Sequence, residues 1–354
     1  MVNGASHKKL LAIGNLKQPV HAWGEIYTGI SAKDYMDGTS NFYGVHSVTL
    51  YVDSVQVFNS TTDKVLPDEN RMINGFTDYE ELTRTRRLIM RSYKLPGNRL
   101  RLLHTNENRG AVTINEERDY HFRYVLEDNF GNRKTYQFIV KGKRQDIPEY
   151  KPEANEMLYW NRTNVIQKPG MELVVPRYYV YEDVPLRTDM RGDSSLIAFD
   201  YILDAGRTPI HSYCDLSIGL RHMPVADTTK YYIVQKAGKW RSSMGGKYAN
   251  GWIKTRVRSL GTFSVDVDTI APQITPIGQG GWRTSRNIRF RIKDMESGIG
   301  SYKVYIDGKF VLFGLKKGIL VIQDPEKVKK GVPHKLEVTV TDQCGNMTRK
   351  EYKF

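Results

Sequence analysis

The sequence predicts an all-β protein built from tandem immunoglobulin-like β-sandwich modules, with one short helix in the first module. The main observation is a strand–turn–strand pattern that occurs twice. Apolar and polar residues alternate through residues 122–138 around the turn Asp128-Asn129-Phe130-Gly131-Asn132, and through residues 336–354 around Asp342-Gln343-Cys344-Gly345-Asn346. Period-two alternation broken by an Asp, Gly and Asn cluster is typical of a half-buried antiparallel hairpin. The chain therefore uses one type of β-module at least twice.

The first and last parts of the chain share further landmarks in the same order. Leu50-Tyr51-Val52-Asp53 is matched by Val304-Tyr305-Ile306-Asp307, and the latter continues into the preferred turn dipeptide Asp307-Gly308. This match supports a second type of hairpin, with its turn at Asp53-Ser54. Several short strands at this spacing suit an immunoglobulin-like sandwich. At the third position of the Asp-x-x-Gly-Asn turns, we expect Phe130 and Cys344 to tuck under their hairpins.

One stretch departs from the β pattern. Residues 77–80, Thr-Asp-Tyr-Glu, fit a capping box, and Tyr79, Leu82 and Ile89 recur at helical spacing, which predicts a short helix near residues 77–90. The apolar run Leu10–Ile13 predicts a strand. No helix start is expected after Gly278–Gly281, so this glycine-rich loop is not interpreted as a phosphate-binding loop.

The length of 354 residues favours two or three domains. Gln145–Pro152 contains two prolines and mixed charge, as linkers do, and Asp268–Pro272 forms a second boundary. We therefore predict domains at residues 1–146, 147–270 and 271–354. The middle domain lacks the Asp-x-x-Gly-Asn hairpin and is expected to be a different β-module.

Composition excludes some classes of protein and leaves others open. The apolar share of 40% is enough for real cores, and no run approaches the roughly 18 apolar residues of a membrane span. The first nine residues show no apolar segment, so no signal peptide is visible. The net charge of +14 favours polyanions in general, but the basic residues are spread along the chain. No nucleic-acid-binding motif is present, so no nucleic acid partner is expected.

The sequence shows no catalytic, cofactor-binding or metal-binding motif. The eight histidines form neither His-x-His nor His-Glu-x-x-His, which leaves no sequence-local metal site. Cys214 and Cys344 are far apart and are interpreted as two buried thiols, with a disulfide as the alternative. Gly192–Leu196 contains Ser194 and Ser195 but lacks the Gly-x-Ser-x-Gly pattern of a hydrolase nucleophile.

Aromatic residues gather in one stretch of the predicted middle domain. Trp240, Tyr248 and Trp252 are candidate ligand contacts, since such side chains can build a platform for sugar rings. The aromatic core of a β-sandwich would explain the same residues. Both interpretations stay open at this point.

The order of short motifs along the chain resembles the region that follows the catalytic domain in lysostaphin-type (LytM-like) zinc metallopeptidases of Bacteroidetes. The motifs, each weak alone, span nearly the whole chain. They are His21–Glu25, Tyr43–Val45, Leu50–Asp53, Asn70–Asn74, Asp78–Glu81, Pro96–Asn98, Asn108–Gly110, Asp128–Asn132, Gly251–Trp252, Leu260–Phe263, Asp268–Pro272, Ser297–Ile299 and Asp342–Asn346.

The resemblance fails at the zinc ligands. In that family they come from a His-x-x-x-Asp motif and a later His-x-His, and neither occurs in this sequence. No metal or catalytic residue can therefore be transferred, and zinc is expected only in a catalytic domain that this chain lacks. The resemblance implies the non-catalytic β-sandwich region of such a peptidase, located in the cell envelope, either periplasmic or associated with the outer membrane.

Three functional hypotheses follow. The first is an accessory or scaffold region that positions an upstream catalytic domain or contacts the cell wall, with peptidoglycan or other envelope glycans as partners. The second is a carbohydrate-binding or adhesion module. The third is a hydrolase whose residues come together only in the folded chain. We expect this chain not to be an enzyme.

Overall fold

The computed structural model describes Met1–Val2 and residues 8–38, 40–149, 152–193 and 195–354. Strands hold 45% of the residues and short helices 9%, which confirms the predicted all-β class. Within the described ranges, no helix has both the length and the apolar character needed to cross a bilayer.

The chain forms two compact units, each considered by itself. Unit 1 comprises Met1–Asn164, Val175–Arg187 and Ala205–Tyr213, and unit 2 comprises Val165–Val174, Thr188–Asp204 and Cys214–Phe354. The predicted middle domain, residues 147–270, contributes to both units. The predicted boundaries near residues 146 and 270 stay predictions.

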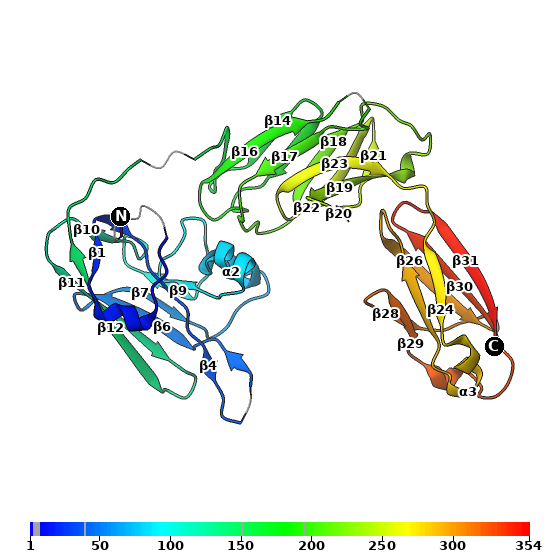
Figure 1. Ribbon diagram of the computed structural model, residues 1–354, viewed down its shortest axis with the longest axis horizontal. Helices are drawn as coiled ribbons and strands as arrows, with labels where there is room; N and C mark the ends of the chain where they lie inside the picture. The colour runs from blue at the N-terminus through cyan, green and yellow to red at the C-terminus, as the bar shows by residue number, and fades with distance from the viewer. Residues whose placement is uncertain (3–7, 39, 150–151, 194) are drawn as a thin grey trace. The chain divides into compact units, whose positions relative to one another are not determined.

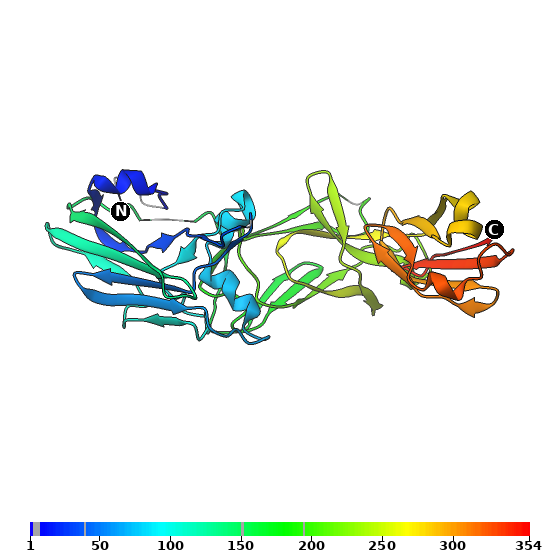
Figure 2. The ribbon, with the colours of Figure 1, turned by 90° about the horizontal axis from the view of Figure 1, so that it is seen from below.

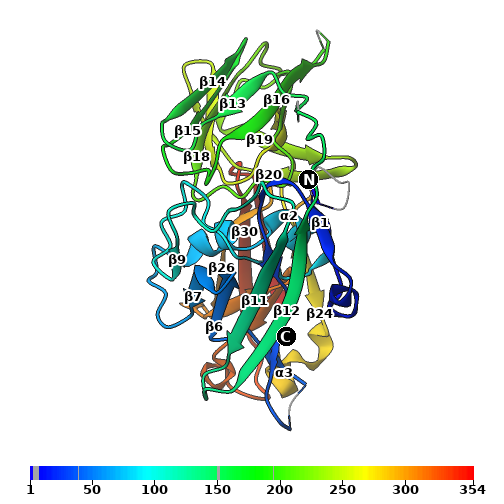
Figure 3. The ribbon, with the colours of Figure 1, turned by 90° about the vertical axis from the view of Figure 1, so that its left-hand side faces the viewer.

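Unit 1 is built around a six-stranded sheet with the order β1-β12-β11-β6-β7-β9. Figure 3 shows β6, β11 and β12 of this sheet in the part of the chain that faces the viewer. Its strands and those of the smaller sheets are β1 Val20–Ala22, β2 Gly24–Ile26, β3 Gly29–Ile30, β4 Asp34–Tyr35, β5 Phe42–Tyr43, β6 Ser47–Val52, β7 Val55–Thr61, β8 Met90–Arg91, β9 Leu103–Thr105, β10 Val112–Ile114, β11 Asp119–Glu127 and β12 Arg133–Gly142. The next strand, β13 Glu156–Leu158, pairs with β16 in another sheet.

Both hairpins predicted in this region are confirmed. Strands β11 and β12 pair antiparallel from Asp119↔Lys141 to Glu127↔Arg133 around the Asp128–Asn132 turn. Strands β6 and β7 pair across Asp53 and Ser54, whose φ angles of 47° and 68° are those of a tight two-residue hairpin turn. Alternate residues of β11 are buried because the sheet has one core face.

The predicted helix is α2, Tyr79–Thr85, preceded by η2 Asn70–Met72 and α1 Ile73–Phe76. The capping box was assigned one residue too early: the cap is Asp78, whose carboxylate accepts from the Glu81 amide at 3.1 Å. The helix ends at Arg86, which is left-handed with a φ of 64°. A second correction concerns Leu10–Ile13, which contains no strand; the 3-10 helix η1, Ile13–Lys17, begins there and lies beside β12 (Figures 1 and 2).

Unit 2 contains two sheets from the middle of the chain and two from its end. The strand orders of the first two sheets are β13-β16-β17-β23-β19-β20 and β14-β15-β18-β22-β21. In the first of these sheets, β13 and the part of β16 with which it pairs belong to unit 1. The middle strands are β14 Asn164–Lys168, β15 Met171–Val175, β16 Val184–Arg191, β17 Asp200–Asp204, β18 Cys214–Gly219, β19 Tyr231–Ala237, β20 Trp240–Ser243, β21 Lys247–Ala249, β22 Trp252–Val257 and β23 Gly261–Val267, with η3 at Thr228–Lys230.

The last part of the chain is a sandwich of two four-stranded sheets, β24-β25-β29-β28 and β27-β26-β30-β31. The predicted 336–354 hairpin is β30 and β31. The elements are β24 Gln273–Ile277, η4 Gln279–Gly281, α3 Trp282–Ser285, β25 Arg289–Lys293, β26 Ile299–Ile306, β27 Lys309–Phe310, β28 Phe313–Lys316, β29 Ile319–Ile322, η5 Pro325–Lys327, β30 Lys335–Asp342 and β31 Met347–Lys353.

The core of this sandwich draws alternate residues from both sheets. Phe290 and Leu320 from one sheet and Val338 from the other are fully buried together with Trp282. Trp282 belongs to α3, so the expectation that no helix follows Gly278–Gly281 was wrong: a helix of four residues begins directly after the loop. The loop interpretation missed it because a single turn has no periodicity to read.

Candidate functional site

The three aromatic residues predicted as ligand contacts lie on two different sheets. Trp240 begins the edge strand β20 and is 81% exposed. Tyr248 lies on β21 with an exposed fraction of 37%, and Trp252 lies half-buried on β22, where its ring covers Gly219. No ring contact joins any two of them in the described part of the chain. The structure does not assemble them into a row, and their role as ligand contacts stays a prediction.

Unit 1 contains a hollow of about 1440 Å³ that the sequence did not indicate. It is lined by the N-terminal segment, the residues around β2 and β3, the N-cap of α2, the segment that follows α2 through β8, and parts of β11 and β12. Its volume exceeds the roughly 300–1,000 Å³ of common small-molecule pockets. The hollow is therefore large enough for an extended ligand.

Two tyrosines form an aromatic wall of the hollow. Strands β3 and β8 pair antiparallel, Gly29 with Arg91, and the Ser92 amide donates to the Thr28 carbonyl at 2.9 Å. This register places Tyr27 opposite Tyr93, with ring centroids 4.7 Å apart. Tyr27 is 50% exposed, so one of the two rings offers much of its surface to solvent.

The polar groups around this wall are ordered. The Tyr27 hydroxyl donates to the Glu25 carboxylate, and burial, followed by this hydrogen bond, raises the pKa of Tyr27 to about 12. The Arg91 guanidinium carbon lies 5.6 Å from the centre of the Tyr93 ring. Behind them, the buried Tyr124 hydroxyl shares hydrogen bonds with Ser92 and Thr28 at 2.7 and 2.8 Å, which fixes the floor of the hollow.

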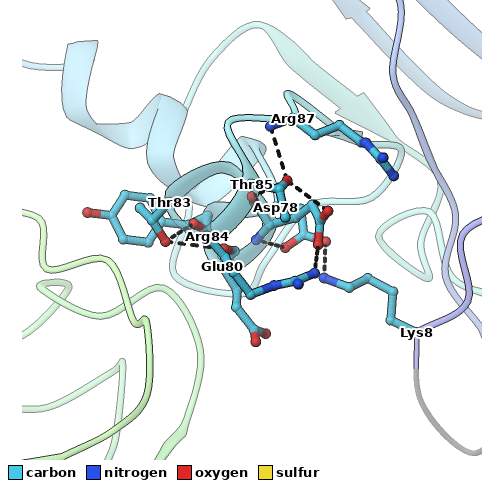
Figure 4. Close-up of polar contacts among 9 residues, drawn as sticks. Lys8, Asp78, Glu80, Thr83, Arg84, Thr85 and Arg87 are labelled. Carbon is cyan, nitrogen blue, oxygen red and sulfur yellow. Dashed lines mark hydrogen bonds and ion pairs between the residues drawn. The ribbon is translucent and has the colours of Figure 1, made fainter.

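Asp78, the N-cap of α2, lies in the lining of the hollow, and Figure 4 shows its polar contacts. Its carboxylate caps α2 with one oxygen and accepts from the Lys8 ammonium at 2.6 Å with the other. On the same helix, Glu81 is held by Arg84 at 2.6 Å and by the Thr85 hydroxyl at 2.9 Å. Lys8 thereby ties the N-terminal segment to α2.

A second polar cluster, here called the aspartate joint, lies in unit 2. Asp268 and Asp342 are buried, Asp294 is half-buried, and one carboxylate oxygen of each lies within 4.8 Å of the others. Asp268 follows β23, Asp294 follows β25 and Asp342 ends β30. Such an all-oxygen donor set suits Ca²⁺ or Mg²⁺ and not the nitrogen and sulfur preference of zinc.

Protein donors already satisfy much of the aspartate joint. Asp268 accepts from the Ser297 hydroxyl at 2.5 Å, from the Ser297 amide at 3.0 Å and from the Ile270 amide at 2.9 Å. The Asn346 amide group donates to the Asp268 carbonyl at 2.9 Å and to Asp342 at 2.7 Å. These bonds explain the cluster as a polar connection between strands. The expectation that this chain holds no metal stays a prediction.

The two Asp-x-x-Gly-Asn turns have the same internal geometry but opposite surroundings. Asp128 accepts from the amides of Phe130 and Asn132 at 2.8 and 2.9 Å, and Asp342 accepts from the amides of Cys344 and Asn346, both at 2.8 Å. Cys344 is 2% exposed and packs with residues of β19, whereas Phe130 is 89% exposed. The expectation for Cys344 is confirmed, and that for Phe130 was wrong because nothing described covers its turn.

These surroundings predict opposite pH dependence for the two turns. Hydrogen bonds from Asn132 lower the pKa of Asp128, so its ionised form stabilises the fold above the ordinary value of 3.8, and that stability is lost on acidification. Burial, with the charge of Asp268, raises the pKa of Asp342, so the fold loses stability as pH rises through the shifted value. Asp128→Asn should therefore destabilise the chain more at about pH 7 than at about pH 3. Asp342→Asn should show the opposite pattern and destabilise the chain less at about pH 7 than at about pH 3.

Urea unfolding of both variants and the parent chain at the two pH values checks this. The two turns serve as each other's control, because they lose the same type of bonds. Variants whose losses change with pH in the same direction would contradict the expectation.

The remaining sequence candidates do not form a site in the described residues. Ser195 donates to Asp193 at 2.5 Å within an exposed turn, and Ser194 lies outside the described residues, as does His7. His334 is held between Asp307 and the Lys329 carbonyl at 2.6 and 2.7 Å.

The two cysteines lie apart and are buried, and no disulfide joins them within the described chain. Burial raises the pKa of Cys344 to about 11 and that of Cys214 to about 12, which makes thiolate chemistry unfavourable. The prediction of two buried thiols is therefore confirmed.

Comparison with known proteins gives one match to a family model. A Zu5-like domain matches residues 155–268, which is less than half of the chain. A search of curated proteins found no match. The resemblance to lysostaphin-type peptidases is not tested by these results and stays a prediction.

Among solved structures, the chain is similar to bacterial adhesins and a glycan-binding protein at a low level. A Ca²⁺-stabilised adhesin with which an Antarctic bacterium binds ice is 10% identical, with 93% of each chain covered and a TM-score of 0.17. A 1.5-MDa bacterial ice-binding adhesin is 8% identical over 88% of this chain and 86% of its own, with a TM-score of 0.15. SGBP-B of the Bacteroides ovatus mixed-linkage glucan utilization locus is 11% identical over 87% of this chain and 59% of its own, with a TM-score of 0.15. TM-scores this low carry no conclusion about this chain.

Proposed function

We propose that this chain is a non-catalytic, glycan-binding region of a cell-envelope or cell-surface protein, and that unit 1 holds the glycan in its hollow. The observation that carries the proposal is the half-exposed Tyr27 ring, backed by Tyr93 at 4.7 Å on the wall of the hollow. It corresponds to the carbohydrate-binding alternative drawn from the sequence, at a different place from the one expected there.

The chemistry of the hollow suits a sugar polymer. The C–H face of a pyranose ring is apolar and packs on an aromatic ring, while its hydroxyls need fixed donors and acceptors at the edge. Tyr27 supplies the ring, Glu25 an acceptor and Arg91 a donor, and all three line the hollow. The large volume leaves room for several linked sugars. Peptidoglycan and other envelope glycans are the partners that the proposal names.

Replacing Tyr27 by alanine should weaken glycan binding at least about tenfold, or ~1.4 kcal/mol, because the stacking surface is lost. Stability should change little, since the ring is 50% exposed. The measurement is co-sedimentation with peptidoglycan sacculi over a salt series, with thermal unfolding of each variant alongside.

Trp240→Ala is the matched control, since it removes a more exposed aromatic ring on a strand of unit 2. It should leave sedimentation unchanged. Loss of binding in Trp240→Ala with normal binding in Tyr27→Ala would move the site to β20 and overturn the proposed location. No sedimentation of the parent chain with any envelope glycan would overturn the function itself.

A second candidate function rests on the order of motifs along the chain. The lysostaphin-type resemblance favours an accessory region that works beside a zinc-dependent catalytic domain, with the glycan held for that domain to cleave. The same sacculus assay, with zinc added and released muropeptides measured, tests whether this chain cleaves. Release that a chelator abolishes would contradict the non-catalytic reading and favour a hydrolase.

A further inference from the structure

We infer that the glycan held in the hollow is an acidic one, whose carboxylates are bound by two arginines of the lining: Arg91, which lies beside Tyr93, and Arg87. This inference rests on the proposed glycan-binding function and specifies its ligand. The observation behind it is a difference among the charged side chains of the lining. Some of them already form ion pairs within the protein, and others do not.

Two carboxylates of the lining, those of Glu25 and Asp78, are engaged. Glu25 accepts the hydrogen bond of the Tyr27 hydroxyl. Asp78 accepts from the Lys8 ammonium at 2.6 Å and from the Glu81 amide at 3.1 Å, as Figure 4 shows. Asp78 and Lys8 neutralise each other, whereas Glu25 keeps its negative charge and is held by the neutral Tyr27 hydroxyl.

The two guanidinium groups of this region, in contrast, form no ion pair with any described residue. Arg87 uses its backbone amide to bond the Thr85 hydroxyl at 3.2 Å, while its side chain extends away from α2 (Figure 4). Arg91 makes one long hydrogen bond, from its guanidinium to the Gly75 carbonyl at 3.4 Å. Within the ranges that the structure describes, neither arginine has a carboxylate within ion-pair distance.

The lining of the hollow as a whole also carries an excess of positive charge. Basic side chains outnumber acidic ones in the lining, seven to five. Glu182 interacts electrostatically with Arg91 at longer range. Burial raises the pKa of the Glu182 carboxyl group, which makes Glu182 a weaker counter-ion for Arg91. Two guanidinium groups without an ion pair in the lining, one of them beside the aromatic wall, favour a planar anion, because the guanidinium fork matches a carboxylate with two parallel hydrogen bonds.

Other ligands fit these groups less well. A neutral sugar would satisfy the tyrosine wall but would not use the two guanidinium groups. A cationic polymer would be repelled by them. A uronate-containing glycan places a carboxylate on the sugar ring, so the ring can stack on Tyr27 while the charge meets the arginines at its edge.

The test compares two ligands with the same sugar backbone, one charged and one neutral: oligogalacturonides and their methyl esters, titrated calorimetrically onto the full chain. We expect the acid form to bind at least about tenfold more tightly, with an affinity that falls as salt is added. The double variant Arg87→Gln/Arg91→Gln should lose this preference and keep the weaker affinity for the ester. Arg86→Gln is the matched control, since Arg86 lies beside Arg87 but does not line the hollow.

The outcomes separate the two levels of the inference. Equal binding of acid and ester by the parent chain would overturn the acidic-ligand inference and leave the proposed glycan binding intact. Loss of the preference in Arg86→Gln as well would overturn the assignment to Arg87 and Arg91. Binding of neither form would overturn the inference, and if sacculi are not bound either, the proposed function falls with it.

Discussion

Replacing Trp282 by alanine should lower the free energy of unfolding of unit 2 by about 3–5 kcal/mol, the range for removing a fully buried tryptophan. Trp282 is 1% exposed and meets Phe290, Tyr352 and Phe354 edge to face, with ring centroids 5.0, 5.9 and 5.7 Å away. Its indole N–H also donates to the Ile277 carbonyl at 3.0 Å. The substitution therefore leaves a cavity and removes the donor of a half-buried hydrogen bond.

Urea unfolding of the variant measures this loss, with Trp240→Ala as the control. Trp240 is 81% exposed, so its replacement should stay within about 0.5 kcal/mol of the parent chain. Equal losses in the two variants would show that Trp282 does not hold the sandwich together as its contacts indicate.

The contrast between these tryptophans shows what the sequence could predict and what it could not. The hairpins at 122–138 and 336–354 were predictable because alternation and turn residues are local and use the same chemistry in both places. The class of the fold followed from them. Trp282 was missed as a core residue because it belongs to a four-residue helix after a glycine-rich loop, which leaves no periodic pattern.

The sequence of a turn likewise does not determine whether the turn is buried or exposed. Phe130 and Cys344 occupy the same position of the same motif, yet one is 89% exposed and the other 2%. The hydrogen bonds inside each turn are local, whereas burial depends on β19, more than a hundred residues before Cys344. Sequence patterns specify the first kind of contact and not the second.

The candidate site was missed for the same reason. The hollow joins Lys8, Tyr27, Asp78 and Arg91, which no motif connects. One local signal was present: the spacing of Glu25 and Tyr27 on a short strand-like segment places them on one side of the chain. It becomes meaningful only once the pairing of β3 with β8 brings Tyr93 opposite Tyr27.

Replacing Asp268 by alanine should cost about 3 kcal/mol of stability in unit 2, because buried donors lose their acceptor. Asp268 is fully buried, and its carboxylate accepts from the Ser297 hydroxyl and amide and from the Ile270 amide. Ser297 is itself fully buried, so its hydroxyl has no access to water as a replacement partner. Thermal and urea unfolding measure the loss.

Asp268→Asn separates the two effects that meet in the aspartate joint. It keeps one carbonyl oxygen as an acceptor and removes a negative charge that lies within 4.8 Å of Asp294 and Asp342. We therefore expect a smaller loss than for alanine, since relief of like-charge repulsion offsets part of the lost hydrogen bonding. Asp266→Ala is the control two residues earlier: the side chain of its partner Arg241 is 57% exposed, so the loss of this pair should cost less than about 1 kcal/mol. If Asp268→Ala were as mild as this control, the joint would contribute shape but no stability, and its buried hydrogen bonds would be balanced by the repulsion among its three carboxylates.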